Sequence, residues 1–262
     1  MISFMREQEH IAYTTEFGVA IKSPQLPLWI LLHEKKNTEQ QNLKQKQSEN
    51  IQLFFNTFLQ KYPQCLIGLV AEEKTALICA KLYNKPFNKR DMAAYYLKEK
   101  IASYTMKEMG DKNIHPLTQT QDIKLVQKWI HNFYIETLNV APPSFQKQQQ
   151  ESKKKDKPKN LPNTQIYLLK DEKKNETVAM GMLSDVVDNI CRINLIYTPP
   201  HLRGRGYGKQ MVCGLVSIAQ NKGIYPMLYT TLDNAIANKL YQSLGFIKAG
   251  QLTEILFSTH HP

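Results

Sequence analysis

The segment YTPPHLRGRGYGKQ, from Tyr197 to Gln210, constrains the fold more than any other part of this 262-residue chain. It lies between the strand-like run RINLIYT and an apolar stripe with helical spacing that begins near Gly208. Because proline lacks an N–H donor, we expect strand pairing to stop near Pro199 and Pro200. Glycine permits positive φ values and carries no Cβ atom, so the N–H groups that follow can turn toward a common point.

The same segment opens into the predicted helix, and this adds a second attraction for anions. The unpaired N–H groups of a first helical turn and the positive end of the helix dipole point toward whatever lies before the helix. Here Arg203 and Arg205 add positive charge among the three glycines. The segment therefore predicts a binding site for a phosphate or pyrophosphate group. The alternative is a tight glycine turn with two exposed arginines.

Two well-known phosphate-binding loops do not fit this segment. A P-loop requires GxxxxGK followed by serine or threonine, whereas Gly208 and Lys209 are followed by Gln210. A dinucleotide fingerprint requires GxGxxG early in a strand–helix–strand unit, whereas this chain has GxGxG late in its length. The sequence thus favours neither a nucleoside triphosphate nor a dinucleotide.

Two motifs, taken together, carry a resemblance to a known family. Arg203, Gly206 and Gly208 match R/Q-x-x-G-x-G/A, and NAIANKLYQSLGF, about 30 residues further on, matches N-x-x-A-x-x-L-Y-x-x-x-G-F. This pair resembles the GNAT superfamily of acyl-CoA-dependent N-acetyltransferases, and the resemblance covers roughly residues 113–257. The strand ending in LIYTPP resembles a bacterial type whose GNAT domain follows a degenerate GNAT-like half. The second motif consists of Asn234, Ala237, Leu240, Tyr241, Gly245 and Phe246.

The resemblance implies an enzyme that moves an acetyl group from acetyl-CoA to a primary amine by direct attack, without a metal. The backbone of Leu195, Ile196 and Tyr197 would bind the pantetheine arm as an added strand would, and an N–H near Tyr197 would polarise the thioester carbonyl. The pyrophosphate of the coenzyme would be held by Arg203, Gly204, Arg205, Gly206, Tyr207 and Gly208. A GNAT-like module that binds acyl-CoA or another protein without turnover is the alternative.

Several side chains are candidates for roles in the implied reaction. Asn234 would bind pantetheine or cap the helix that follows it. Tyr241 lies two helical turns later, on nearly the same face, and would donate a proton to the departing CoA thiolate, unless it is an ordinary core tyrosine. A base for the amine is not identified; Glu136 and Asp185 are candidates, and so is a water chain. His201 is interpreted as a surface residue.

The periodicity of the chain indicates two domains. We predict a smaller α/β domain over residues 1–112 and the GNAT domain over residues 113–262, with a Lys/Gln/Pro-rich loop at 141–163. The second domain reads as a strand meander followed by a strand–helix–strand crossover, which predicts a mixed, mainly antiparallel sheet flanked by helices, an α/β (α+β) fold. In the first domain we predict a helix at 50–62, two strands within 65–83 and a helix at 90–110.

Composition narrows the range of partners. The formal charge is +11, and the lysine-rich run at 147–159 contributes +4 of it, with almost no aromatic residue on which bases could stack, so nucleic acid is not the favoured partner. The four cysteines form no CxxC pair and have no metal-ligand spacing, so neither a zinc site nor a disulfide framework is predicted. The N-terminus lacks a signal peptide, and no apolar run reaches the ~20 residues that span a bilayer, which predicts a cytoplasmic protein. The amine acceptor and the oligomeric state stay open.

Overall fold

The computed structural model describes residues 11–22, 27–32, 40–62, 66–99, 113–118, 120–138, 165–184 and 186–258. Its contacts divide the chain into two compact units. The first contains residues 1–93, 231–233 and 250–262, and the second contains residues 94–230 and 234–249. Strands β5 (Phe87–Tyr96) and β11 (Ile247–Phe257) carry residues of both units. The Lys/Gln/Pro-rich segment 141–163 and the candidate base Asp185 lie outside the described residues.

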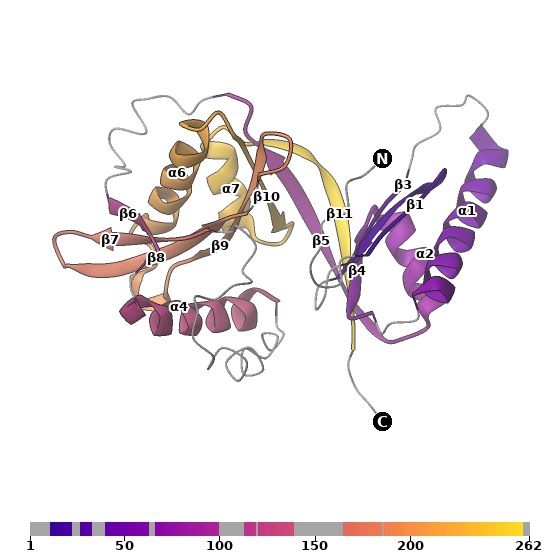
Figure 1. Ribbon diagram of the computed structural model, residues 1–262, viewed down its shortest axis with the longest axis horizontal. Helices are drawn as coiled ribbons and strands as arrows, with labels where there is room; N and C mark the ends of the chain where they lie inside the picture. The colour runs from indigo at the N-terminus through magenta and orange to yellow at the C-terminus, as the bar shows by residue number, and fades with distance from the viewer. Residues whose placement is uncertain are drawn as a thin grey trace. The chain divides into compact units, whose positions relative to one another are not determined.

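The first unit begins with an antiparallel meander and continues with two helices (Figure 1). Strand β3 is antiparallel to β2 and parallel to β4. The strands that carry residues of the first unit follow the order β1-β2-β3-β4-β11-β5 in the sheet. The meander consists of β1 (Ile11–Thr15), β2 (Gly18–Lys22) and β3 (Leu28–Leu32), and it is followed by α1 (Gln40–Lys61), β4 (Gly68–Ala71) and α2 (Glu73–Tyr83). The helices cover a core that includes Leu28, Ile30, Ile51, Phe54, Phe55, Phe58 and Leu69.

The second unit repeats a meander, a crossover helix and a parallel strand. Strand β10 is parallel to β9, whereas β6 to β9 are antiparallel neighbours, and the order is β5-β10-β9-β8-β7-β6. Its elements are β6 (Ile114–Pro116), α4 (Thr120–Phe133), the π-helix η2 (Tyr134–Leu138), β7 (Gln165–Asp171), β8 (Glu176–Leu183), β9 (Ile190–Tyr197), the 3-10 helix η3 (Pro200–Leu202), α6 (Tyr207–Gln220), β10 (Tyr225–Thr231) and α7 (Ala235–Ser243).

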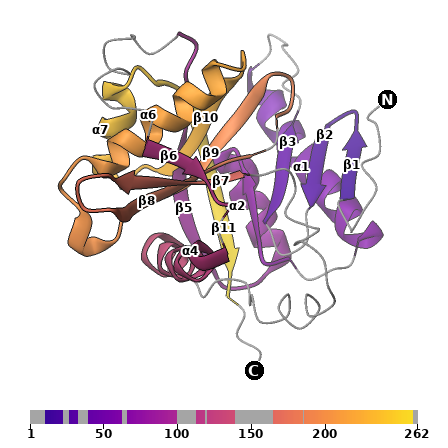
Figure 2. The same ribbon diagram turned by 60° about the vertical axis from the view of Figure 1, so that its left-hand side comes forward.

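Helices cover both faces of the sheet in the second unit. Helix α4 lies on one face of β7–β9, and α6 and α7 lie on the other (Figures 1 and 2). Under α4, the apolar stripe of Val126, Trp129 and Ile130 packs against Met180 and Tyr197, as its helical spacing predicts. The predicted fold class, a mixed and mainly antiparallel sheet flanked by helices, is confirmed.

Two elements of the first half differ from the prediction. The second strand expected within 65–83 is helix α2, which Glu72 caps by accepting a hydrogen bond from the N–H of Thr75 at 3.2 Å. The helix expected over 90–110 begins as strand β5, where Ala93 and Tyr95 are buried and their neighbours are less so. Alanine and methionine favour helices, but a place between β11 and β10 imposes the extended form, because tertiary context overrides local propensity.

Candidate functional site

Strand β9 is interrupted where the sequence predicts the pantetheine-binding backbone. Met180 of β8 pairs with Tyr197, but Met182 pairs with Asn194, so three steps along β9 face two steps along β8. Leu195 takes up the extra residue at φ +50°, a value that is strained for a leucine. This β-bulge removes Leu195 and Ile196 from the regular ladder, and such bulges redirect a strand's groups toward a site.

From Ile193 onward, and so already before the bulge, β9 is no longer paired with its parallel neighbour β10. The two strands pair from Ile190 with Tyr225 to Arg192 with Met227. The carboxyl-terminal halves of both strands, Ile193–Tyr197 and Leu228–Thr231, lie past this paired stretch. Backbone groups on the facing edges are therefore placed to pair with an extended ligand instead of with each other.

The glycine-rich segment forms the open turn that the sequence predicts. Gly204 and Gly206 have φ values of +77° and +79°, and a Cβ atom built on either would meet nothing within 4 Å. Helix α6 begins directly after Gly206, and the first N–H to bond back to it is that of Gln210. The Arg203 amide differs from the prediction in being occupied, because it donates to the carbonyl of Pro200 at 3.2 Å. The amides that the sequence predicts to bind an anion therefore begin after Arg203.

The side chain of Arg203 is held by its own protein. It forms an ion pair with Glu136 of η2, and its Nε donates to the carbonyl of Thr198 at 2.9 Å. Glu136 also accepts a hydrogen bond from the hydroxyl of Tyr197 at 2.9 Å. Burial alone would raise the pKa of Glu136, but the bonds from Arg203 and Tyr197 outweigh it and lower that pKa. Glu136 is therefore an ionised anchor between η2 and the glycine turn.

The other predicted residues of the turn point in different directions. The side chain of Arg205 is exposed, and its guanidinium donates to the carbonyl of His201 at 3.5 Å. His201 is exposed, as expected. The ring of Tyr207 is buried, and its hydroxyl donates to Asp171 at 2.6 Å, which fixes the first turn of α6 against the end of β7. Only the backbone of Tyr207 is thus available to a ligand.

The residues of the second motif lie on α7 and at its two ends. Asn234 caps this helix, since its Oδ1 accepts from the N–H of Ala237 at 3.0 Å. Tyr241 is buried, with its ring 6.1 Å from that of Tyr95 and 5.9 Å from that of Phe246. Burial raises the pKa of Tyr241 to about 12. The hydroxyl is therefore protonated throughout the physiological range.

Three features of the second unit were not predicted from the sequence. Gly181 lies opposite the bulge, and a Cβ there would come within 2.8 Å of Ile196 Cδ1. A glycine inside a strand is a signal for a bulge, so this position was detectable. The bond between Tyr197 and Glu136 joins residues 61 positions apart. The hydroxyl of Thr198 is buried without a hydrogen-bond partner in the described structure, 3.9 Å from where a Cβ of Gly208 would lie.

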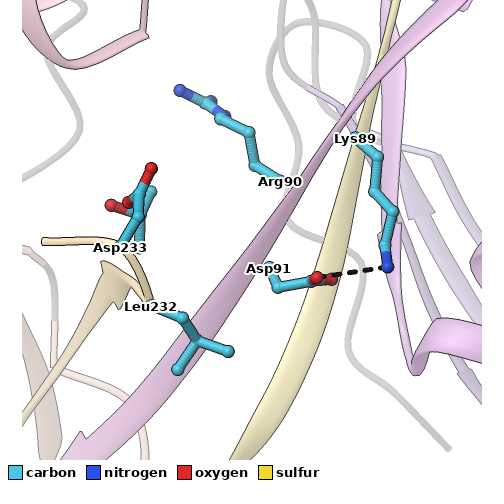
Figure 3. Close-up of a pocket in the computed structure, with 6 residues that line it drawn as sticks. Lys89, Arg90, Asp91, Leu232 and Asp233 are labelled. Carbon is cyan, nitrogen blue, oxygen red and sulfur yellow. Dashed lines mark ion pairs between the residues drawn. The ribbon is translucent and has the colours of Figure 1, made fainter.

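The first unit contains a separate polar pocket of about 240 Å³ (Figure 3). Its lining consists of Lys89, Arg90 and Asp91 of β5 together with Thr231–Asp233. Lys89 forms an ion pair with Asp91 at 3.1 Å, and Arg90 with Glu254. A hydrogen bond from Thr253 is the main cause that lowers the pKa of Asp91. The cations of this pocket are thus matched by carboxylates of the same unit.

Other classes of site have no support in the described parts of the chain. No three His, Cys, Asp or Glu side chains gather there as a metal site would require. Cys79, Cys191 and Cys213 are buried thiols, and burial raises the pKa of each. None of the helices seen in these residues combines the length and the apolar character needed to cross a membrane.

Comparisons with known proteins agree with the fold. The family model for the acetyltransferase (GNAT) family matches residues 128–246. A search of curated proteins gave no match. Among solved structures, the chain is similar to a functionally unknown conserved protein from Staphylococcus epidermidis ATCC 12228, at 14% identity and a TM-score of 0.55 over 96% of this chain and 94% of that one.

Two further solved structures carry a family description. One is an acetyltransferase from the GNAT family of Colwellia psychrerythraea, at 15% identity and a TM-score of 0.50 over 95% of this chain and 85% of that one. The other is a GCN5-related N-acetyltransferase-like protein from Streptococcus suis 89/1591, at 10% identity and a TM-score of 0.56 over 95% and 88%. At such identities the likeness shows a shared fold.

Proposed function

We propose that this chain, whose residues 128–246 match the family model of the acetyltransferase (GNAT) family, transfers an acetyl group from acetyl-CoA to a primary amine. The observation that carries the proposal is the pair of positive-φ glycines, Gly204 and Gly206, directly before helix α6. Such a turn offers backbone N–H groups and the positive end of a helix dipole to one anion. A Cβ atom built on either glycine would meet nothing within 4 Å, so the side of the turn that a diphosphate would approach is open there.

The bulged strand supplies the second part of the proposal. The pantetheine arm would extend along Leu195–Tyr197, on the edge of β9 that lies past its pairing with β10. An N–H near Tyr197 would donate to the thioester oxygen, where negative charge develops as the amine attacks. The unpartnered hydroxyl of Thr198 offers a further hydrogen bond beside the start of α6. Asn234, at the start of α7, would serve the pantetheine amide or its own helix.

Tyr241 is proposed to assist the departing sulfur. In the reaction the uncharged amine nitrogen bonds to the carbonyl carbon, the carbon–sulfur bond breaks, and one amine proton ends on the thiolate. A thiol ordinarily has a pKa of about 8.5, whereas the phenol of Tyr241 has a pKa of about 12, so the thiolate is a weaker base than the Tyr241 phenolate. The Tyr241 hydroxyl would therefore stabilise the sulfur as a hydrogen-bond donor and relay the proton, rather than ionise itself.

No side chain is assigned as the base. Glu136 lies beside Tyr197, but its two hydrogen bonds and lowered pKa make it a weak proton acceptor. The amine would then lose its proton to water or to a group outside the described residues, where Asp185 lies. The cytoplasmic location expected from the sequence stays a prediction.

The test is an acceptor screen that measures release of the CoA thiol, run with wild type and Tyr241→Phe. We expect the variant to lose turnover by about 10²-fold or more, with unchanged CoA affinity by calorimetry. Tyr225→Phe, at an exposed tyrosine of β10, is the matched control and should be unaffected. If the wild type binds neither acetyl-CoA nor CoA at millimolar ligand, the proposed function is wrong. Binding without turnover over a broad amine panel would indicate a non-catalytic module.

A further inference from the structure

Arg192 is a half-buried arginine in the middle of the second unit. It lies on β9, two residues before Asn194, where the register shift begins. Its backbone is fixed by Ser184, whose N–H donates to the Arg192 carbonyl at 2.9 Å and whose Oγ accepts from the Arg192 N–H at 2.8 Å. Its guanidinium carbon is 5.9 Å from the ring centre of Tyr229 on β10. The backbone of Arg192 is thus fixed by hydrogen bonds, and its guanidinium lies beside the ring of Tyr229.

The positive charge of Arg192 is not balanced by a carboxylate in the described structure. In the described residues, Lys89, Arg90 and Arg203 form ion pairs, and Arg192 takes part in none of these pairs. Burial is strong enough to lower the pKa of Arg192, and the phenols that face it, Tyr229 and Tyr134, have raised pKa values and are neutral. A desolvated guanidinium with five N–H donors is costly without an acceptor, so such a group is commonly completed by a ligand.

Arg192 also lies on the side of the sheet where an acyl acceptor would approach. Tyr134, which interacts with Arg192, packs in the cluster under α4 together with Leu195 and Tyr197. At a rise of about 3.3 Å per residue, three steps of strand separate Arg192 from Leu195 by about 10 Å. An arginine side chain spans much of that distance. The thioester position near Tyr197 lies five steps, or about 16 Å, along the strand from Arg192, so an acceptor whose amine meets it would reach the guanidinium with a group several bonds from that amine.

We propose that Arg192 binds a carboxylate of the acyl acceptor, and hence that the acceptor is an amine of the amino-acid class. This inference rests on the proposed acetyl transfer. A planar guanidinium matches a carboxylate with two parallel hydrogen bonds, which fixes orientation as well as charge. One cation beside the neutral phenol of Tyr229 supplies a single positive charge, which suits a carboxylate better than a doubly charged phosphate. The rings of Tyr134 and Tyr229 would flank the ligand.

The experiment compares acceptors that differ only in the carboxylate. Phenylalanine is paired with 2-phenylethylamine, and lysine with cadaverine, in the CoA-release assay. Wild type should prefer the amino acid of a pair. Arg192→Gln should raise KM for that amino acid about 10- to 100-fold with little change in kcat, and should leave KM for the amine and for acetyl-CoA unchanged. Arg192→Lys keeps the positive charge but not the two parallel N–H donors of the guanidinium, so its KM for the amino acid should lie between those of wild type and Arg192→Gln.

Controls separate this role from a structural one. Lys222→Gln removes a positive charge from an exposed position after α6 and should change none of these constants. Thermal unfolding checks that Arg192→Gln stays folded; Arg192→Lys provides the same comparison if it does not. The inference is overturned if wild type acetylates the carboxylate-free amines equally well, or if Arg192→Gln leaves the KM for amino acids unchanged. Either result leaves the acetyl-transfer proposal intact.

A direct binding measurement covers the case in which no amine is acetylated. Calorimetry with acetyl-CoA present would then titrate the same amino acids into wild type and Arg192→Gln. Saturable binding to wild type that the variant loses supports the carboxylate site even though the proposed reaction has failed. Absence of binding to wild type overturns the carboxylate site as well.

Discussion

The two units of this protein share one order of elements but differ in strand register and in the connection to the crossover helix. In each, three antiparallel strands lead through a helix to a fourth strand parallel to the third, and a second helix and a long strand follow. In the first unit, β2 and β3 pair in regular register, and the seven residues HEKKNTE before α1 contain no glycine. In the second, β9 is bulged at Leu195, and the connection to α6 contains Gly204 and Gly206 at positive φ.

The difference shows that a strand–helix–strand crossover by itself does not make an anion site. The crossover of the first unit buries an aromatic core. In this core the ring centre of Tyr13 lies 5.3 Å from that of Phe54 and 6.0 Å from that of Phe58. The second gives up regular pairing at one strand end, and so leaves backbone groups that a ligand can use. The proposed binding would therefore depend on local departures from regularity that the shared architecture permits but does not require.

The largest expected effect tests the structural role of the first unit. Phe55→Ala removes a ring that is 0% exposed in the core under α1, and we expect the free energy of unfolding to fall by about 3–5 kcal/mol. Leu53→Ala, at a 57% exposed position of the same helix, should cost under about 0.5 kcal/mol. Urea unfolding measures both. A loss of CoA affinity in still-folded Phe55→Ala would break the comparison, because it would assign binding to the first unit.

The next effect tests the glycine turn itself. Gly206→Ala places a methyl group in the open space beside the first turn of α6, and we expect calorimetry to show CoA affinity reduced about 10- to 100-fold. Gly223→Ala is a matched control, since Gly223 has φ +71° and equally open surroundings but lies after the end of α6. Both variants should lose about 1 kcal/mol of stability through strain.

The same titration counts the sites. Wild type should bind one CoA per chain, because among the residues that the structure describes only the second unit has the bulge and the glycine turn. A stoichiometry of two, or full binding by Gly206→Ala, would remove the distinction between the two crossovers.

The smallest effect concerns the anchor between η2 and the turn. The pKa of Glu136 lies below its ordinary value of 4.5, so its contribution to stability is present above that value and is lost as the pH falls through the lowered one. Its side chain is 34% exposed, so the contribution should be under about 1 kcal/mol. Glu136→Gln should therefore lose stability slightly at neutral pH and show a flatter acid dependence. Urea unfolding at about pH 7 and about pH 3.5 measures this.

Glu136→Gln also tests whether Glu136 is the base that takes the proton of the amine. We expect Glu136→Gln to keep CoA release within about threefold of wild type, because the carboxylate already serves Tyr197 and Arg203. A loss of about 10²-fold would instead identify Glu136 as the base of the reaction.

Prediction from the sequence succeeded where residue pattern and local structure agree. The meander, the crossover helix and the helix that begins after Asn234 were all predicted, because alternating burial and helical spacing are written into those segments. It failed at α2 and β5. There Thr75, Ala76, Cys79 and Ala80 form a buried helical stripe among residues that also suit strands, and β5 becomes a strand through its neighbours in the sheet.

The sequence by itself determined the glycine turn and its place between strand and helix, because glycine, proline and an apolar stripe act through the few residues around them. It also determined that Asn234 begins α7. Only the tertiary structure decided that Arg203 turns toward Glu136, that Leu195 is forced into a bulge, and that Arg192 lies beside the ring of Tyr229 without a carboxylate partner in the described structure. Those features join residues far apart in the chain, and their energies depend on burial and charge that no local pattern records.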